Sequence, residues 1–102
     1  MYIAMNRFPV AAGKEEEFEN IWRERERFLA DVEGFKSFRL LRGDEKDGKR
    51  TYISHSTWDS GQAFLAWTDS AAFRRAHQDA RTPDGVVLGP PRFEGYEVVL
   101  DI

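Results

Sequence analysis

Three residues have side chains suited to chemistry on a flat, apolar ligand. Asn6 is an uncharged amide in an apolar amino-terminal stretch, Trp67 lies on the apolar stripe of a short predicted helix, and His77 ends the next helical segment. An amide can donate a hydrogen bond to a ligand, an indole ring can line a flat cleft, and an imidazole can ligate a metal. Each also has a structural interpretation: a backbone-bonded Asn, a core Trp and a helix-terminal His.

The two histidines limit which kinds of metal site the chain can form. The chain has two histidines and no cysteine. We expect His55 to be structural, because it alternates with apolar and β-branched residues in a predicted strand. His77 has the side chain needed to ligate a haem iron. Without cysteines or a nearby carboxylate cluster, a closed zinc site is not favoured.

Composition and missing motifs exclude several classes. The net charge of −3 argues against a non-specific nucleic-acid binder. The sequence lacks a G-x-S-x-G elbow, a phosphate-binding glycine loop, a dinucleotide fingerprint and H-E-x-x-H, which disfavours hydrolases, kinases and nicotinamide-dependent enzymes. Aromatic residues make up 14% of the chain, enough for an aromatic cleft or simply an aromatic core.

The elements that must position these residues follow the order β-α-β-β-α-β. This order predicts one α+β domain over residues 1–102, with a ferredoxin-like antiparallel sheet. Residues 81–91 contain three prolines and two glycines, which predicts a long loop. The expected strands span 2–9, 35–42, 50–58 and 93–102, with a helix over 14–30 and a kinked helical pair after Ser60. We expect Pro9 to end regular pairing and residues 43–49 to form a polar hairpin tip.

The strands carry apolar residues on both faces, for example Ile3 and Met5 against Tyr2 and Phe8. Helices can cover only one face, so the pattern predicts a homodimer that packs sheet against sheet. No stretch approaches the roughly 18 apolar residues of a membrane span. We therefore expect a cytoplasmic protein with no membrane association.

Two spaced motifs and a strand Asn resemble a known family. The motifs are A-F-x-x-W at residues 63–67 and F-x-x-x-H at residues 73–77, and Asn6 lies upstream; Gly34-Phe35 and Trp58 extend the match. Over essentially its whole length the chain resembles the antibiotic biosynthesis monooxygenase (ABM) superfamily, and within it the IsdG-like haem-degrading monooxygenases. This resemblance implies a dimeric α+β barrel.

The resemblance also implies residue roles. His77 would be the haem ligand, Trp67 would buckle the porphyrin, and Asn6 would hydrogen-bond oxygen on the opposite face. The remaining pocket residues implied are Trp22 and Arg25 in the haem-binding helix, with Phe8 and Phe64 completing the pocket. The 81–91 loop would act as a lid, with Arg81 near a haem propionate.

The implied function is a haem oxygenase that uses haem as substrate and cofactor. With O₂ and electrons from an external donor, an unidentified reductase, it would open the ring to a bilin-type product and release iron. The alternatives are a cofactor-independent ABM-type monooxygenase of a quinol or phenol, a non-catalytic haem-binding protein, and a purely structural dimer.

Overall fold

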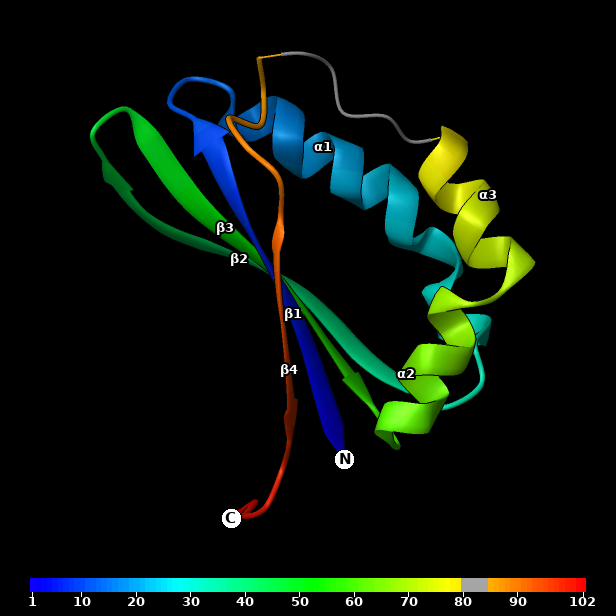
Figure 1. The fold of residues 1–102 in the computed structure, drawn as a ribbon. Helices are drawn as coiled ribbons and strands as arrows, with labels where there is room; N and C mark the ends of the chain where they lie inside the picture. The colour runs from blue at the N-terminus through cyan, green and yellow to red at the C-terminus, as the bar shows by residue number, and fades with distance from the viewer. Residues whose placement is uncertain (80–84) are drawn as a thin grey trace.

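A computed structural model confirms the predicted α+β, ferredoxin-like order of elements (Figure 1). It describes residues 1–79 and 85–102, excluding the side chains of 25–28 and 76–79. The strands are β1 (Tyr2–Ala11), β2 (Phe35–Lys46), β3 (Lys49–Trp58) and β4 (Arg92–Glu97). The helices are α1 (Glu15–Arg25), the 3₁₀ helix η1 (Glu26–Asp31), α2 (Gly61–Thr68) and α3 (Ala71–Asp79).

The four strands form one antiparallel sheet in the order β2-β3-β1-β4. The α-helices all lie on the same side of this sheet (Figure 1). β1 is central, so Asn6 lies opposite Ser54 of β3 and opposite Phe93 of β4. The sheet thus places Asn6 between two neighbouring strands.

The face of β1 that carries Asn6 packs toward the helices; alternation in the sequence shows which residues share this face but not which face the helices cover. Ala4 and Val10, which share this face, are buried in the core. The core has two clusters. The first contains Val10, Phe18, Trp22, Tyr52 and Val86, and the second contains Ala4, Leu29 and Trp58.

The β2–β3 hairpin is tighter than the sequence analysis predicts. Asp47 and Gly48 have φ values of +54° and +78° and form a two-residue turn, so pairing continues through Lys46 and Lys49. An Asp-Gly pair is favoured in such turns because both residues tolerate positive φ. The predicted hairpin is therefore confirmed, but its strands extend past the expected ends at residues 42 and 50 into the polar tip predicted over residues 43–49.

The sequence analysis predicted that Pro9 ends the regular pairing of β1, and this prediction is wrong. Pro9 stays in register with Thr51, and its carbonyl accepts a 2.7 Å hydrogen bond from the Leu88 amide on the other side. A residue's N–H and C=O point to the same side of an antiparallel strand, so the missing N–H of proline faces away from β3. The β3 ladder therefore loses no hydrogen bond.

Two valines in the described part of the predicted 81–91 loop anchor it to the core. The Val86 carbonyl accepts a 2.9 Å hydrogen bond from the Ala11 amide, and Val87 forms an isolated bridge with Val10. The Val86 side chain is 1% exposed and packs in the first cluster. The lid prediction is therefore wrong for Val86 and Val87; residues 80–84 lie outside the described part.

Two further boundaries differ from prediction. The first helix changes to 3₁₀ geometry after Arg25 instead of continuing to residue 30. The last strand ends at Glu97 instead of continuing to residue 102, because its partner β1 begins only at Tyr2. One further hydrogen bond joins the Val98 amide to the Met1 carbonyl. Residues 98–102 consequently extend beyond the sheet, with Val99, Leu100 and Ile102 exposed.

We predict that Val86→Ala lowers the free energy of unfolding by about 1–3 kcal/mol, because it removes buried methyl groups and leaves a cavity. Leu88→Ala, at a side chain that is 49% exposed, is the matched control and should change it by less than about 0.5 kcal/mol. Urea denaturation of both variants gives the comparison. Equal effects of the two substitutions would contradict the placement of the Val86 side chain in the core.

Candidate functional site

A cavity of about 310 Å³ lies between the sheet and the helices, and Asn6 lines it. We call it the Asn6 cavity. Its described lining is mostly aromatic, with a few uncharged polar side chains and no charged one. The lining residues are Asn6, Trp22, Leu29, Phe38, Ser54, Ser56, Trp58, Phe64, Trp67, Thr68, Phe73 and Phe93.

Two serine caps position the helical part of this lining. Ser60 Oγ accepts from the Ala63 amide at 3.1 Å and begins α2, and Ser70 Oγ accepts from the Phe73 amide at 3.1 Å and begins α3. The first of these caps agrees with the helical pair expected after Ser60. The break between the helices brings Trp67 and Phe73 into edge-to-face contact, with ring centroids 5.4 Å apart.

Gly34 allows α2 to lie this close to the start of β2. Its φ is +81°, and a β-carbon built there would lie 2.5 Å from the Ala63 β-carbon. Any side chain at residue 34 would push α2 away from the sheet. Gly34 therefore helps to set the position of the wall that carries Phe64 and Trp67.

The Asn6 side-chain amide is a free hydrogen-bonding group in the cavity. It makes no hydrogen bond to another group in the described part of the chain. Ser56, by contrast, accepts from Trp58 Nε1 at 2.9 Å and donates to the Ala4 carbonyl at 3.4 Å. The backbone-bonded interpretation of Asn6 thus does not describe this structure, and the amide can donate to a ligand.

Stacked aromatic rings form two walls of the Asn6 cavity. Phe64 stacks on Phe93 with centroids 5.6 Å apart and planes 7° apart, and Trp22 stacks on Phe38 at 5.6 Å and 16°. Phe38 and Phe93 were not among the predicted site residues. Strand alternation was the only sequence signal for these two residues. Each helps to form a cavity wall only because a residue distant in sequence, Trp22 or Phe64, stacks on it.

The structure brings Asn6, Trp22, Phe64 and Trp67 of the predicted site together. It does not place Phe8 in the lining: that ring packs against Phe18 and Trp22 in the core, with centroids 5.4 and 5.5 Å away. His77 belongs to α3 and Arg25 is the last residue of α1, but both side chains lie outside the described part. Residue 81 also lies outside it.

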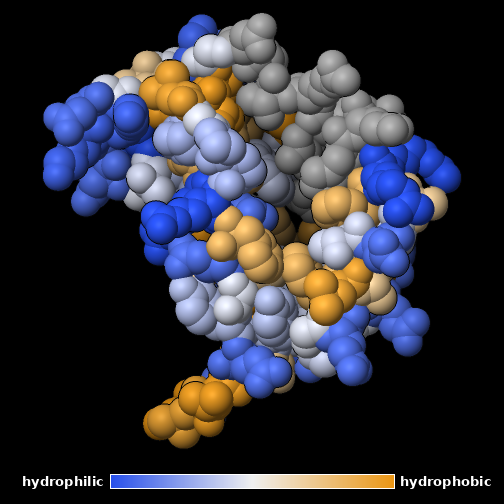
Figure 2. All heavy atoms as spheres, viewed as in Figure 1, coloured by the Kyte–Doolittle hydropathy of each residue, from blue (hydrophilic) through white to orange (hydrophobic). Residues whose placement is uncertain are grey.

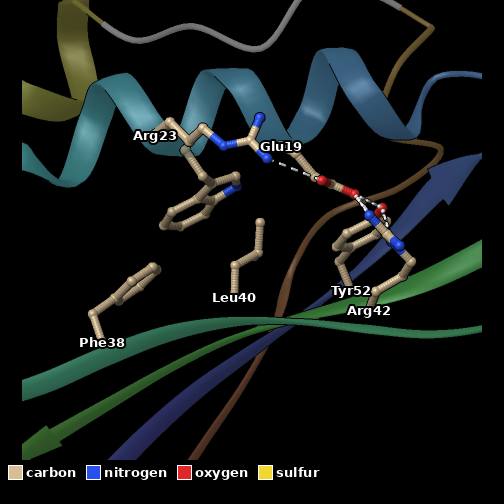
Figure 3. Close-up of a pocket in the computed structure, with 7 residues that line it drawn as sticks. Glu19, Arg23, Phe38, Leu40, Arg42 and Tyr52 are labelled. Carbon is tan, nitrogen blue, oxygen red and sulfur yellow. Dashed lines mark hydrogen bonds and ion pairs between the residues drawn. The ribbon is translucent and has the colours of Figure 1, made fainter.

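A second cavity, of about 420 Å³, lies between α1 and β2 (Figure 3). We call it the Glu19 cavity. Glu19 and Arg23 approach it from the helix, while Phe38, Leu40, Arg42 and Tyr52 approach from the sheet (Figure 3). Trp22 and Phe38 line both cavities.

Hydrogen bonds converge on the Glu19 carboxylate. The Tyr52 hydroxyl donates to it at 2.5 Å, Arg42 Nε donates at 3.0 Å, and Arg23 Nη2 lies 3.4 Å away. The Tyr52 hydroxyl, followed by Arg42, lowers the pKa of Glu19, whereas burial and the bond to Glu19 raise the pKa of Tyr52. Glu19 and Arg23 are one helical turn apart, whereas the Arg42 and Tyr52 contacts join strands distant in sequence and were not predicted.

We predict a pH-dependent effect of Glu19→Gln. Because the folded-state pKa of Glu19 is lowered, its carboxylate stabilises the fold above the unfolded value of about 4.3, and this stabilisation is lost as the pH falls through the lowered pKa. The variant should be less stable by about 1 kcal/mol at pH 7, and the difference should shrink as the pH falls below the unfolded value of about 4.3. Urea denaturation across this range measures it.

Asp44→Asn, in the exposed part of the hairpin, is the control for loss of a carboxylate. Its free energy of unfolding should differ little from that of the wild type at neutral or at acid pH. A Glu19→Gln effect that is independent of pH would contradict the ionic account of this network.

Among the described residues, no group of three or more His, Asp or Glu side chains is arranged to hold a metal ion. No helix in that part of the chain has the length and hydropathy of a membrane span.

The known proteins most informative for this site are haem oxygenases. The chain is 32% identical over 100 residues to "Heme oxygenase (mycobilin-producing)" of Mycobacterium tuberculosis. This match covers 98% of this chain and 90% of the relative. It is 31% identical over 93 residues to "Heme oxygenase (staphylobilin-producing)" of Staphylococcus saprophyticus, covering 87% and 88%. These relatives confirm the resemblance to the IsdG-like branch.

Solved structures agree on the fold. The heme-degrader MhuD of M. tuberculosis, with two hemes in its active site, matches with a TM-score of 0.78 and 27% identity over 100% of this chain and 99% of its own. SnoaB, a cofactor-independent oxygenase from Streptomyces nogalater, matches with a TM-score of 0.75 and 22% identity over 99% and 95%, which shows the shared fold alone. The model of the antibiotic biosynthesis monooxygenase family matches residues 1–79. The chain therefore belongs to the antibiotic biosynthesis monooxygenase family.

Proposed function

We propose that this protein is a haem-degrading monooxygenase, with residues 1–102 forming one catalytic domain. The observation that carries the proposal is the Asn6 cavity, which is bordered by the helix to which His77 belongs. Its described lining is aromatic and uncharged, and the Asn6 amide makes no hydrogen bond within the described part of the chain. The relatives named heme oxygenases support the same substrate. In the proposed reaction haem is opened to a bilin-type product and its iron is released.

The chemistry of the lining fits a tetrapyrrole. A planar conjugated ring gains affinity from apolar burial and ring contacts, and the described lining supplies indole and phenyl rings without an unpaired charge. Haem would be ligated by the His77 imidazole and packed against Trp67 and Phe64. Bound haem supplies the iron at which O₂ and electrons from an external reductase are used.

The protein's own side chains would orient the substrate and set the polarity of the cavity around it. Asn6 would donate its amide hydrogens to oxygen on the face opposite His77, where developing negative charge needs a donor. Trp67, fixed edge-to-face by Phe73, would press on the ring and favour one carbon for attack. Trp22 would cover the ring edge, supported from behind by Phe8, and Arg25 would act from the end of α1.

We predict that His77→Ala and Asn6→Ala separate binding from turnover. The first should remove stable iron ligation and shift or abolish the haem absorption band. The second should leave a saturable band but slow ring opening by about 10²-fold, the typical effect of removing one preorganised donor. Absorbance titration, followed by reduction in air, measures both effects.

The chain supplies a matched control, since its second histidine lies on the other face of the sheet. His55→Gln should leave the haem spectrum as in the wild type. An unchanged spectrum in His77→Ala would contradict the ligand assignment, and unchanged turnover in Asn6→Ala would contradict the role of the amide.

We also propose that the protein is a homodimer packed through the sheet face opposite the helices. Ile3, Met5 and Ile53 lie on this face with only partial burial, and the Arg7–Glu94 ion pair neutralises charge on it. The apolar carboxy-terminal residues 98–102 also protrude from the body of the molecule (Figure 2). A second copy would cover apolar surface that is otherwise left in water.

We predict that Ile53→Glu dissociates this dimer, because it places a charge on the apolar face. Leu65→Glu makes the same change at an exposed position on α2 and should leave the association unchanged. Sedimentation velocity distinguishes the mass of the monomer from that of the dimer. A monomeric wild type, or dissociation by both variants, would contradict the proposed interface.

A further inference from the structure

A second polar side chain lies beside Asn6 on the sheet side of the Asn6 cavity. Ser54 of β3 is the residue directly opposite Asn6 of β1, and both residues line the cavity. Directly opposite residues of an antiparallel pair point to the same face and have β-carbons about 4.5–5.5 Å apart. The Ser54 hydroxyl and the Asn6 amide are therefore close enough to contact the same small ligand.

The Ser54 hydroxyl is buried and has no hydrogen-bond partner. Ser54 is 6% exposed, and its side chain makes no hydrogen bond within the described part of the chain. In that part, His55 Nδ1 is the only side-chain N or O atom that is both fully enclosed and unpartnered. Ser54 Oγ must therefore reach open space, and the space that Ser54 lines is the Asn6 cavity.

The other hydroxyl groups of the described lining are already used in the fold. Ser56, two residues further along β3, donates to the Ala4 carbonyl at 3.4 Å. Thr68 of α2 donates to the Leu65 carbonyl at 2.9 Å. Among these hydroxyls, the proton of Ser54 is the one that remains available to a ligand.

We propose that Ser54 is a second hydrogen-bond donor to the oxygen side of the substrate and acts there together with Asn6; this inference rests on the proposed function. A small ligand that carries negative charge loses the hydrogen bonds of water when it enters an aromatic cavity. The hydroxyl and the amide replace these bonds with two donors fixed on neighbouring strands. If Ser54 were structural instead, its hydroxyl would stabilise the protein in the absence of haem.

The first test uses the protein without haem. Ser54→Ala removes a buried hydroxyl that has no partner, so the midpoint of urea denaturation should stay the same or rise. Ser56→Ala removes a bonded hydroxyl, so its midpoint should fall. A fall in Ser54→Ala as large as that in Ser56→Ala would overturn the inference.

The second test measures the binding of small ligands to the haem complex. Fluoride binds ferric haem and accepts hydrogen bonds, whereas carbon monoxide binds the reduced complex and is a poor acceptor. Ser54→Ala should weaken fluoride binding by about threefold to tenfold, the effect of one hydrogen bond. Its affinity for carbon monoxide should stay within about twofold of the wild type. Absorbance titrations give both dissociation constants.

Thr57→Val is the matched control. Thr57 is 8% exposed, and its side chain also makes no hydrogen bond within the described part, but it lies on the opposite face of β3. This variant should bind fluoride as the wild type does, and equal weakening in Thr57→Val and Ser54→Ala would overturn the inference.

The haem titration separates this inference from the proposed function. A wild type that binds haem, but binds fluoride no more tightly than Ser54→Ala or not at all, would overturn the role of Ser54 and leave the proposed function intact. A wild type that binds no haem would overturn both.

Discussion

The arrangement of both cavities depends on the packing of Trp22 between α1 and the sheet. The indole is largely buried, stacks on Phe38 of β2, and meets Phe8 of β1 edge-on. It therefore belongs to the first core cluster and at the same time forms a wall of each cavity. Aromatic packing of this kind is rigid and excludes water, so the stability of the fold and the shape of the site are coupled.

Polarity is distributed unevenly around this wall. On one side the described lining is aromatic and uncharged, with Asn6 as its free amide. On the other side Glu19 gathers Tyr52 and two arginines. The uncharged aromatic lining around Asn6, together with the haem oxygenases among its relatives, is the basis of the proposed activity.

Local patterns in the sequence predicted much of the fold. Strand alternation indicated which residues share a strand face with Asn6, and the position of Ser60 indicated where the helical pair begins. The pattern could not separate Asn6 from Phe8, which share a face, because Phe8 is covered by Phe18 and Trp22 of α1. That coverage depends on how the helix crosses the sheet, which periodicity does not specify.

Long-range contacts account for the remaining differences. Prolines and glycines indicated a loop over residues 81–91, yet Val86 is buried because Pro9 and Ala11 bond to this segment. The Glu19 cavity joins residues from α1, β2 and β3 and has no signature in any single stretch. Propensity describes one segment at a time, whereas these features form only when segments meet.

The central claim is that haem is the substrate, and a single absorbance experiment tests it most directly. Purified protein is titrated with haem, and the complex is then given ascorbate in air with an iron chelator present. The account predicts a Soret band that saturates at one haem per chain and then decays as iron becomes chelatable. A saturated band that persists when ascorbate is replaced by a competent reductase would instead indicate a haem-binding protein. The absence of saturable binding would contradict the account and favour a quinol or phenolic substrate.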